Sequence, residues 1–312
     1  EKGRKLTFNK FRKWWGRRTT LRKYDPAQAW EEYRGVIRGS KEALESKSGF
    51  LSKEDYFQLP GGRTAYPIAE RKELYETFIQ PFHDSLTGTE WDDLTLARKI
   101  LTSDNFVPLY RHIYIDEVQD LTEMQLLLLL RLTLRQQECQ CEKRQQCNCG
   151  PDCPSCECIV FDATGDISQQ VYPSRFRWEE TKVLIHNELN LKIQKLAKPL
   201  NTSYRSVRSI VDMANWYLQQ MDDNNKQGHE IEEALTSESG VHPSIISASS
   251  DKIISLLTEF NLPQPHCPLI VRDEDDKQKI SKQIEDSQTN KNNRIDSSLF
   301  VFTIAESKGL EF

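Results

Sequence analysis

The sequence reads His112-Ile113-Tyr114-Ile115-Asp116-Glu117-Val118-Gln119-Asp120 at the point that decides the fold. Its first four residues are largely apolar and β-branched, which predicts a short buried strand. Thr122-Glu123-Met124-Gln125 follows with the spacing of a capping box, and this predicts the start of a helix. The Leu-rich run behind it is apolar nearly all round, so we expect that helix to be buried. The sequence therefore predicts a strand that ends in two carboxylates and leads into a buried helix.

A second strand candidate is Ile159-Val160-Phe161, which ends near Gly165-Asp166. Strand, helix and strand in this order predict a parallel α/β sheet. Further elements are expected towards the C-terminus: strands at 269–271 and 300–302, an amphipathic helix after Tyr204-Arg205-Ser206, and loops over 222–240 and 281–298.

Residues 1–88 are predicted to be mostly helical. Asp25-Pro26 has the form of an N-cap followed by a proline in the first turn, and apolar residues follow at helical spacing. We expect this helix to end at Gly39. A second helix is expected around 74–82, with a kink near Pro81.

The net charge of −5 hides an asymmetry. Residues 1–23 contain ten Lys and Arg residues and one acid, a local charge of +9, which leaves −14 for the remainder. This distribution excludes a uniformly basic nucleic-acid binder but allows a basic patch on an acidic body. The basic segment is open to two interpretations, a solvated tail and a nucleic-acid contact.

The 312 residues are enough for about two domains. Hydrophobic residues make up 37% and charged residues 29% of the chain, so it can bury a core. The longest apolar run, 126–130, is far shorter than a membrane span requires, and no secretory leader is visible. We therefore expect an intracellular protein, in the nucleus or the cytoplasm. Because the sequence lacks a first Met and stops at Leu310-Glu311-Phe312, we also expect a fragment of a longer chain.

Seven of the eight cysteines lie between 139 and 158, which favours a reducing compartment with thiols that are free or metal-bound. Cys147, Cys149, Cys153 and Cys156 could close one structural Zn²⁺ site with no catalytic role. A low-complexity loop is an equally open interpretation, because no His lies within the cluster.

Further motifs follow the acidic one in a fixed order. They are Gly165-Asp166-Ile167-Ser168-Gln169-Gln170-Val171-Tyr172, Phe176-Arg177, Asn201-Thr202-Ser203-Tyr204-Arg205-Ser206 and Thr303-Ile304-Ala305-Glu306-Ser307-Lys308-Gly309-Leu310-Glu311-Phe312. This ordered set resembles the motor core of superfamily-one DNA helicases of the UvrD/Rep/PcrA type, the UvrD-like helicases. The segments DPAQAWEEYRGVIRGS, GFLSKEDY and WDDL are similar to the large eukaryotic tetratricopeptide and ankyrin repeat-containing helicase-like family.

The resemblance implies an α/β fold, with two partial RecA-like P-loop NTPase lobes built on parallel sheets and a mostly helical accessory subdomain. The implied domains are the accessory subdomain with its basic N-terminus at 1–95, the C-terminal part of the first lobe at 96–188, and a truncated second lobe at 189–312. The Cys-rich insertion, 138–158, belongs to the first lobe. The implied cofactors are ATP and Mg²⁺, and the implied partner is single-stranded nucleic acid, DNA in preference to RNA.

The resemblance also implies a role for each matched residue. Asp116 would coordinate Mg²⁺, Glu117 would activate the attacking water, and Gln169 would sense the γ-phosphate. Arg205 would act as an arginine finger that stabilises charge in the transition state, and Glu311 would bind the ribose of the nucleotide.

The implied nucleic-acid contacts are Tyr172, Phe176 and Arg177, which would lie under a single strand where flat groups stack on bases. Phe176 is open to a second interpretation as a core residue. Lys308 would link the nucleotide and strand sites.

The chain also departs from the helicase pattern. No Gly-x-x-x-x-Gly-Lys-Ser/Thr phosphate-binding loop occurs in the 312 residues, and Ala305 stands where bacterial relatives have His. The leading hypothesis is an ATP-dependent helicase or translocase whose isolated 312-residue chain hydrolyses ATP poorly. The alternative is a catalytically degenerate helicase-like scaffold that binds nucleic acid or protein.

Overall fold

The computed structural model describes most of the chain. The described residues are 4–86, 88–133, 160–189, 200, 202–225, 233–235, 243–247, 250–259, 262, 267–287, 300–308 and 310. The zinc candidates Cys147, Cys149, Cys153 and Cys156 lie outside the described residues, and so does Glu311.

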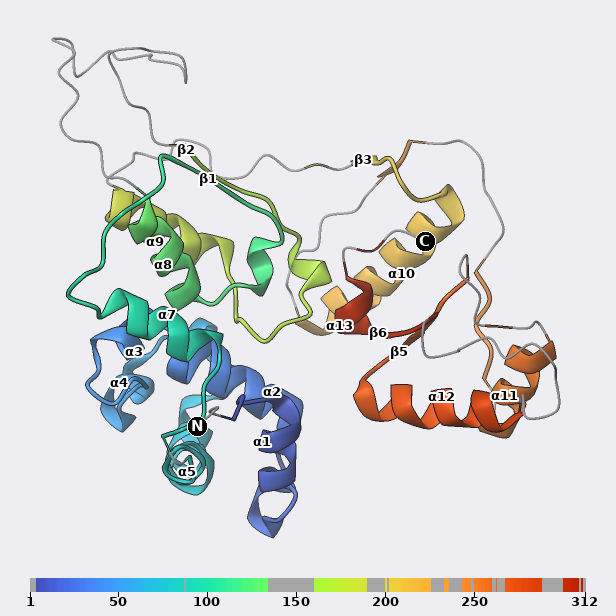
Figure 1. Ribbon diagram of the computed structural model, residues 1–312, viewed down its shortest axis with the longest axis horizontal. Helices are drawn as coiled ribbons and strands as arrows, with labels where there is room; N and C mark the ends of the chain where they lie inside the picture. The colour runs from blue at the N-terminus through green and yellow to red at the C-terminus, as the bar shows by residue number, and fades with distance from the viewer. Residues whose placement is uncertain are drawn as a thin grey trace, which may run out of the picture. The chain divides into compact units, whose positions relative to one another are not determined.

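The chain divides into two compact units, Glu1–Lys198 (unit 1) and Pro199–Phe312 (unit 2). Within the described residues, unit 1 combines a helical part with a strand pair and its helices, and unit 2 combines short strand pairs with helices (Figure 1). The domain boundary expected near residue 95 therefore falls inside unit 1.

The helical part of unit 1 is built around aromatic side chains. Its helices are α1 (Phe8–Trp15), α2 (Pro26–Glu31), α3 (Lys41–Glu45), α4 (Lys53–Gln58), α5 (Ile68–Leu74) and α6 (Gln80–Asp84), with π-helical segments η2 (Glu32–Arg38) and η4 (Tyr75–Ile79) and 3-10 turns η1 (Thr19–Leu21) and η3 (Gly61–Arg63). The buried ring of Phe11 has its centroid 5.3 Å from that of Trp15, 5.4 Å from Phe78 and 5.1 Å from Phe82. Burial of each such side chain contributes about 1.5–3 kcal/mol, so this cluster holds α1 against η4 and α6.

Local sequence signals set the ends of the first helices. The Asp25 carboxylate accepts hydrogen bonds from the backbone N–H groups of Ala27 (3.3 Å) and Gln28 (3.0 Å), and Pro26 occupies the first turn, as predicted. Gly39 ends η2, also as predicted.

The strand part of unit 1 follows the order predicted from the acidic stretch. Its elements are α7 (Asp93–Leu101), β1 (His112–Ile115), η5 (Val118–Asp120), α8 (Glu123–Leu132), β2 (Val160–Ala163), η6 (Ile167–Gln169) and α9 (Trp178–Leu189). β1 and β2 pair in parallel, with Ile115 opposite Ala163. The predicted capping box is confirmed at α8, where Thr122 Oγ1 accepts from Gln125 N and Gln125 Oε1 accepts from Thr122 N.

Helix α8 is buried, as its Leu-rich sequence predicts. Leu126, Leu127 and Leu130 pack in one cluster with Ile115 of β1 and Leu184 of α9. The two helices therefore form the layer that supports the strand pair, as Figure 1 shows.

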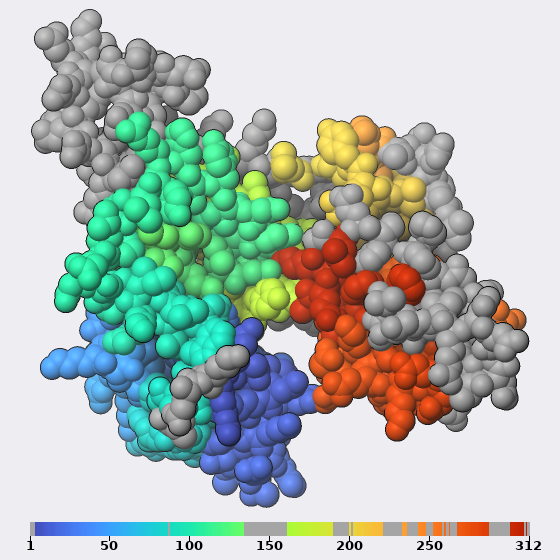
Figure 2. Space-filling view, in the orientation of Figure 1, coloured from blue at the N-terminus to red at the C-terminus, as the bar shows by residue number. Residues whose placement is uncertain are grey.

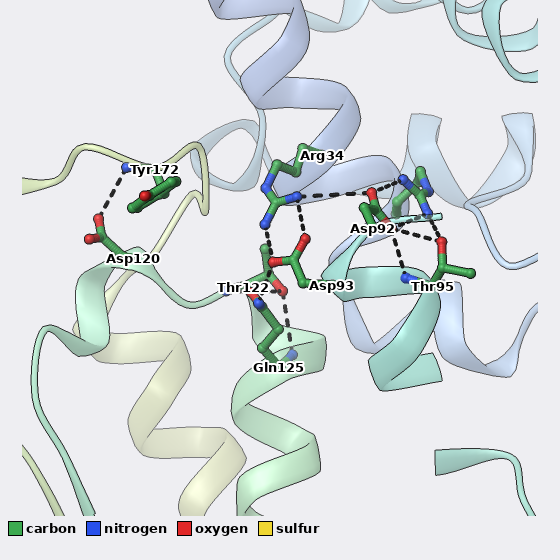
Figure 3. Close-up of polar contacts among 9 residues, drawn as sticks. Arg34, Asp92, Asp93, Thr95, Asp120, Thr122, Gln125 and Tyr172 are labelled. Atoms are coloured by element: carbon green, nitrogen blue, oxygen red, sulfur yellow. Dashed lines mark hydrogen bonds and ion pairs between the residues drawn. The ribbon is translucent and has the colours of Figure 1, made fainter. Parts of the chain in front are cut away.

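Charged side chains join the helical part to the strand part (Figure 3). The Arg38 guanidinium of η2 donates from Nη2 to Asp92 Oδ1 (3.0 Å), and both groups are buried. Arg34 Nη1 donates to Asp93 Oδ1 (2.8 Å), and Gln125 of α8 donates to the other oxygen of the same carboxylate (2.7 Å). These contacts connect η2, the start of α7 and α8, so the two parts of unit 1 pack as one body.

Unit 2 contains two parallel strand pairs and the helices that follow them. Its described elements are β3 (Thr202–Ser203), α10 (Arg208–Asn225), β4 (Glu233–Ala234), α11 (Ser250–Glu259), β5 (Leu269–Val271), α12 (Glu274–Ser287), β6 (Val301–Thr303) and α13 (Ile304–Ser307). β3 pairs with β4 and β5 with β6. Val271, Ile284 and Val301 form its buried cluster.

The expected α/β fold with two RecA-like lobes is wrong for the described residues. They are mostly helical, and their strands form three separate two-stranded parallel pairs rather than two extended sheets. The predicted strands are apolar runs of three or four residues, and such a run predicts a strand without fixing how many further strands join its sheet.

Two local expectations are corrected as well. The strand at 112–115 is only partly buried: Tyr114 is 71% exposed and only Ile115 is buried. The stretches 222–240 and 281–298 are not loops throughout, because α10 extends to Asn225 and α12 to Ser287.

Figure 2 shows in blue that N-terminal residues of unit 1 lie at the surface. Among the described residues, no helix is long and apolar enough to cross a membrane.

Candidate functional site

The candidate site lies in the two loops that follow β1 and β2. Asp116 and Glu117 come directly after β1, and Gly165 and Asp166 follow β2. Because the strands are parallel, both loops leave the pair at the carboxyl ends of its strands. These ends are where parallel α/β arrangements bind ligands.

Asp116 is exposed, and one of its carboxylate oxygens is held in place. Oδ1 accepts hydrogen bonds from Thr164 Oγ1 (2.9 Å) and from the backbone N–H of Glu117 (2.9 Å). Oδ2 accepts no hydrogen bond from any residue that the structure describes. The side chain is thus oriented through one oxygen and presents the other to solvent.

Glu117 adopts a left-handed backbone conformation, with φ of 55°. A non-glycine residue in this region carries strain, and such strain is concentrated at functional sites. Its half-buried carboxylate accepts a hydrogen bond from the Gln119 amide. Arg175, with φ of 56°, is the other non-glycine residue of this kind in the described ranges.

Gln119 is fully buried and links the two loops. Its amide nitrogen donates to Glu117, and its Oε1 accepts from the backbone N–H of Asp166 (3.0 Å). Its backbone carbonyl accepts from Ser174 Oγ (2.5 Å). A single residue therefore fixes the position of the Glu117 carboxylate relative to the segment 166–174.

Gly165 allows the two loops to approach closely. A Cβ at this position would lie 2.8 Å from Val118 Cγ1 and closer still to the amide oxygen of Gln119. The backbone of residue 118 also donates to the Thr164 carbonyl (2.9 Å). The contact between the loops thus requires a residue without a side chain here.

Asp166 organises the short turn η6. Its Oδ1 accepts from the backbone N–H of Ser168 (2.8 Å), and its Oδ2 accepts from Gln169 Nε2 (2.7 Å). The exposed Gln169 side chain is therefore held next to the loop that follows β2.

Of the three expected nucleic-acid contacts, Tyr172 and Arg177 are exposed and Phe176 is not. Asp120 Oδ1 accepts from the backbone N–H of Tyr172 (3.1 Å; Figure 3), and the tyrosine side chain remains 48% exposed. Phe176 is 8% exposed and packs edge-on against Trp178, so it is a core residue and presents no face to a strand. Arg177 Nη1 forms an ion pair with Glu180 (3.3 Å).

The remaining expected site residues belong to unit 2. Arg205 is exposed in the turn between β3 and α10, and Lys308 is the C-cap of α13. The capping box of α13 is complete, because Thr303 Oγ1 accepts from Glu306 N (3.2 Å). The structure gives the positions of Arg205 and Lys308 within unit 2 only.

No group of three or more His, Cys, Asp or Glu side chains in the described ranges could hold a metal ion. Mg²⁺ does not require such a group, since proteins bind it through one or two carboxylates together with water and substrate phosphates. The exposed Oδ2 of the oriented Asp116 fits that mode of binding.

Sequence reasoning missed the residues that assemble the site. Gln119, Gly165 and Ser174 hold the loops together, but the sequence motifs implied functional roles only for neighbouring residues. The signal was present for Gln119, because it is a polar residue inside the quoted acidic stretch. Ser174 carries no local signal, since its partner is 55 positions away in the chain.

No family model matches the sequence. A human protein, TPR and ankyrin repeat-containing protein 1, is 25% identical over 317 aligned residues. The alignment covers 93% of this chain and 9% of the human protein, so the chain spans a small part of that protein's length.

These findings overturn the expected assignment to the UvrD-like helicases; of the narrower resemblance, they support the likeness to a tetratricopeptide and ankyrin repeat-containing protein but not the helicase-like character. No helicase family model matches, and the name of the human protein refers to repeats and not to a helicase. The assignment was carried by short motifs of a few residues each, and such motifs leave the intervening chain untested.

Proposed function

We propose that the loops after β1 and β2 form the metal- and water-orienting part of an ATP-hydrolysing site, and that hydrolysis drives movement along single-stranded nucleic acid. One observation carries the proposal: an oriented, exposed Asp116 lies next to a backbone-strained Glu117 at the carboxyl end of a parallel strand. Two adjacent carboxylates in such a place suit phosphoryl transfer to water.

The two carboxylates have different surroundings and therefore different tasks. Asp116 would hold Mg²⁺ through Oδ2, and the bound ion supplies positive charge to the reacting phosphates. Glu117 is held through its hydrogen bond to Gln119, so its carboxylate can orient a water and accept its proton.

The same contacts offer a route from hydrolysis to the strand. Gln119 contacts Glu117 with its side chain and Ser174 with its carbonyl, and Ser174 lies in the segment that carries Tyr172. An exposed tyrosine can stack on bases without reading sequence. A change at the water-orienting carboxylate would thus shift the aromatic side chain that contacts the strand.

A second candidate is a non-hydrolysing scaffold that binds nucleic acid or protein. The observation that favours it is the lack of a Gly-x-x-x-x-Gly-Lys-Ser/Thr loop in the 312 residues, because this loop usually cradles the nucleotide phosphates. For the same reason we expect the isolated chain to hydrolyse ATP poorly, and tests of hydrolysis require the full-length protein.

The proposal is tested by Asp116→Asn in the full-length protein. Asparagine keeps an oxygen that accepts from Thr164 and Glu117 but removes the charge that holds Mg²⁺. We expect Mg²⁺-dependent ATP hydrolysis to fall by roughly 100-fold, as for the loss of one electrostatic group in an active site. Asp162→Asn, an exposed acid on β2, is the matched control and should leave the rate unchanged. Equal hydrolysis rates for the wild type and Asp116→Asn would contradict the role of Asp116, whereas a wild type that does not hydrolyse ATP would favour the scaffold.

A further inference from the structure

The first helix and the turn after it carry an unusual concentration of positive charge. Residues 4–24 contain nine Lys and Arg residues and no acid. Two lysines in this stretch have acidic partners from other elements: Lys10 pairs with Glu90, and Lys23 Nζ lies 2.6 Å from Glu73.

Lys13, Arg17 and Arg22 form what we call the cationic patch. All three are exposed, and none of them has an acidic partner among the described residues. Lys13 and Arg17 are four residues apart, and the helical hydrogen bond from Gly16 N to the Arg12 carbonyl (2.9 Å) keeps the chain coiled between them. Lys13 lies in the last turn of α1 and Arg17 follows its C-cap, Gly16, so both positive charges stand at the C-terminal end of the helix.

Neighbouring residues of the same segment fix the backbone that carries the cationic patch. Arg18 stacks on Trp14, with its guanidinium carbon 3.4 Å from the ring centroid, and donates to the Trp14 carbonyl (2.9 Å). This contact closes the turn that displays Arg17. Leu21 is fully buried and anchors the chain next to Arg22.

The apolar face of α1 is not available to a partner. Phe11 and Trp15 are buried in the aromatic core of unit 1, so the exposed side of the helix is basic and polar. A basic amphipathic helix binds a membrane by inserting its apolar face, which this packing prevents. The exposed face therefore suits a partner that offers a line of negative charge.

We propose that the cationic patch binds the phosphates of single-stranded nucleic acid. The choice of partner rests on the proposed function, whereas the charge and exposure of the patch do not. The contact is electrostatic and independent of sequence, because Lys and Arg bind phosphates without reading bases. The patch would add to the affinity for the strand without taking part in hydrolysis.

The test is the salt dependence of binding to labelled oligothymidylate, measured by fluorescence anisotropy on the full-length protein without nucleotide. Each phosphate contact to a single strand contributes about 0.7 to the slope of log affinity against log salt. We expect the variant Lys13→Gln/Arg17→Gln/Arg22→Gln to bind more weakly, with a slope smaller by about 2. The control variant Lys47→Gln/Lys99→Gln/Lys182→Gln removes the same charge from other surfaces and should keep the wild-type slope.

An unchanged slope in the patch variant would overturn the proposal, whether or not the protein hydrolyses ATP. A patch variant that binds oligothymidylate like the wild type but unfolds at a lower midpoint would also overturn the proposal. The cations would then stabilise the C-terminal end of α1 instead of binding a strand. Preferential binding of anionic vesicles or polyglutamate over oligothymidylate would assign the patch to another partner. If the triple variant is destabilised, the three single variants carry the test, each with a slope smaller by about 0.7. Loss of hydrolysis in Asp116→Asn with strand binding intact would separate the two proposals.

Discussion

Gln119 is the buried polar residue on which the candidate site depends. Its side-chain amide donates a hydrogen bond to Glu117 and accepts one from the backbone N–H of Asp166. Its backbone carbonyl accepts a hydrogen bond from Ser174. A buried amide satisfied in this way stabilises one conformation, whereas the same groups left without partners would each cost free energy.

Replacement of Gln119 by Ala should therefore destabilise unit 1. The backbone N–H of Asp166 would lose its acceptor, and we expect a loss of about 1–3 kcal/mol in the free energy of unfolding. Urea titration followed by tryptophan fluorescence would measure it. Gln28→Ala, at an exposed position of α2, should change the same quantity by no more than about 0.5 kcal/mol. A cost for Gln119→Ala as small as that of the control would show that the residue does not hold the loops.

Gly165 lies where the structure leaves no room for a side chain. An added Cβ would meet the side chains of Val118 and Gln119, so Gly165→Ala should cost about 1–3 kcal/mol through displacement of the loop. Gly61→Ala is the matched control, because a Cβ there meets no atom within 4 Å. Thermal unfolding of both variants would compare them, and equal midpoints would mean that the two loops do not approach as closely as described.

At the scale of elements, the ion pair between Arg38 and Asp92 joins η2 to the start of α7. Burial raises the pKa of the Asp92 carboxyl, but the charge of Arg38 and the hydrogen bonds from Arg38 and Thr95 together lower it by more, so the pKa lies below its ordinary value of 3.8. The carboxylate also caps α7 by accepting from the backbone N–H of Thr95 (2.8 Å). Pairing and capping thus use the same side chain.

The direction of this pKa shift fixes how stability depends on pH. Because the pKa of Asp92 is lower in the folded chain, its stabilising effect is complete above the ordinary value of 3.8 and is lost as the pH falls through the folded value. Asp92→Asn should cost about 3–5 kcal/mol at neutral pH, since it leaves Arg38 buried without its charge partner. Below pH 3.8 the difference from the wild type should shrink.

Glu76→Gln is the control, because it breaks an exposed pair with Lys53 that water screens, and it should change the stability far less than Asp92→Asn does. Urea titrations at a series of pH values would measure both variants. A constant difference between Asp92→Asn and the wild type across the acid range would contradict the role given to the ion pair.

At the scale of the whole molecule, the division into two compact units predicts more than one unfolding transition. Five of the six tryptophans lie in unit 1, and Trp216 lies in unit 2. Tryptophan fluorescence should therefore follow unit 1, and calorimetry should show a further transition from unit 2. Asp92→Asn should lower only the transition seen by fluorescence. A single calorimetric transition that coincides with the fluorescence change would show that the units unfold together.

The Asp25 and Thr122 caps were predictable, because each signal lies within three residues of its partner. The order of strand, helix and strand around Asp116 was also predictable, and it placed the carboxylates at the correct end of β1. The extent of the sheets was not, because a short apolar run has the same sequence in a pair as in a wide sheet.

The features that could not be predicted depend on contacts between residues far apart in the sequence. Nothing in the sequence near Gln119 indicates Ser174 as its partner, and nothing near Arg38 indicates Asp92. The aromatic residue Phe176 had two open interpretations because its burial depends on Trp178 and the helices beneath it. Such contacts are set by tertiary structure and have no local pattern.

The central claim is that Glu117 orients the water that attacks ATP, and Glu117→Gln in the full-length protein tests it most directly. Glutamine keeps an oxygen that accepts from Gln119 and removes only the proton-accepting charge. The measurement is ATP hydrolysis stimulated by single-stranded nucleic acid, with Glu179→Gln on the surface of α9 as control. We predict that Glu117→Gln loses roughly 100-fold or more in rate while strand binding persists and the control stays active. An unchanged rate in Glu117→Gln would contradict the claim.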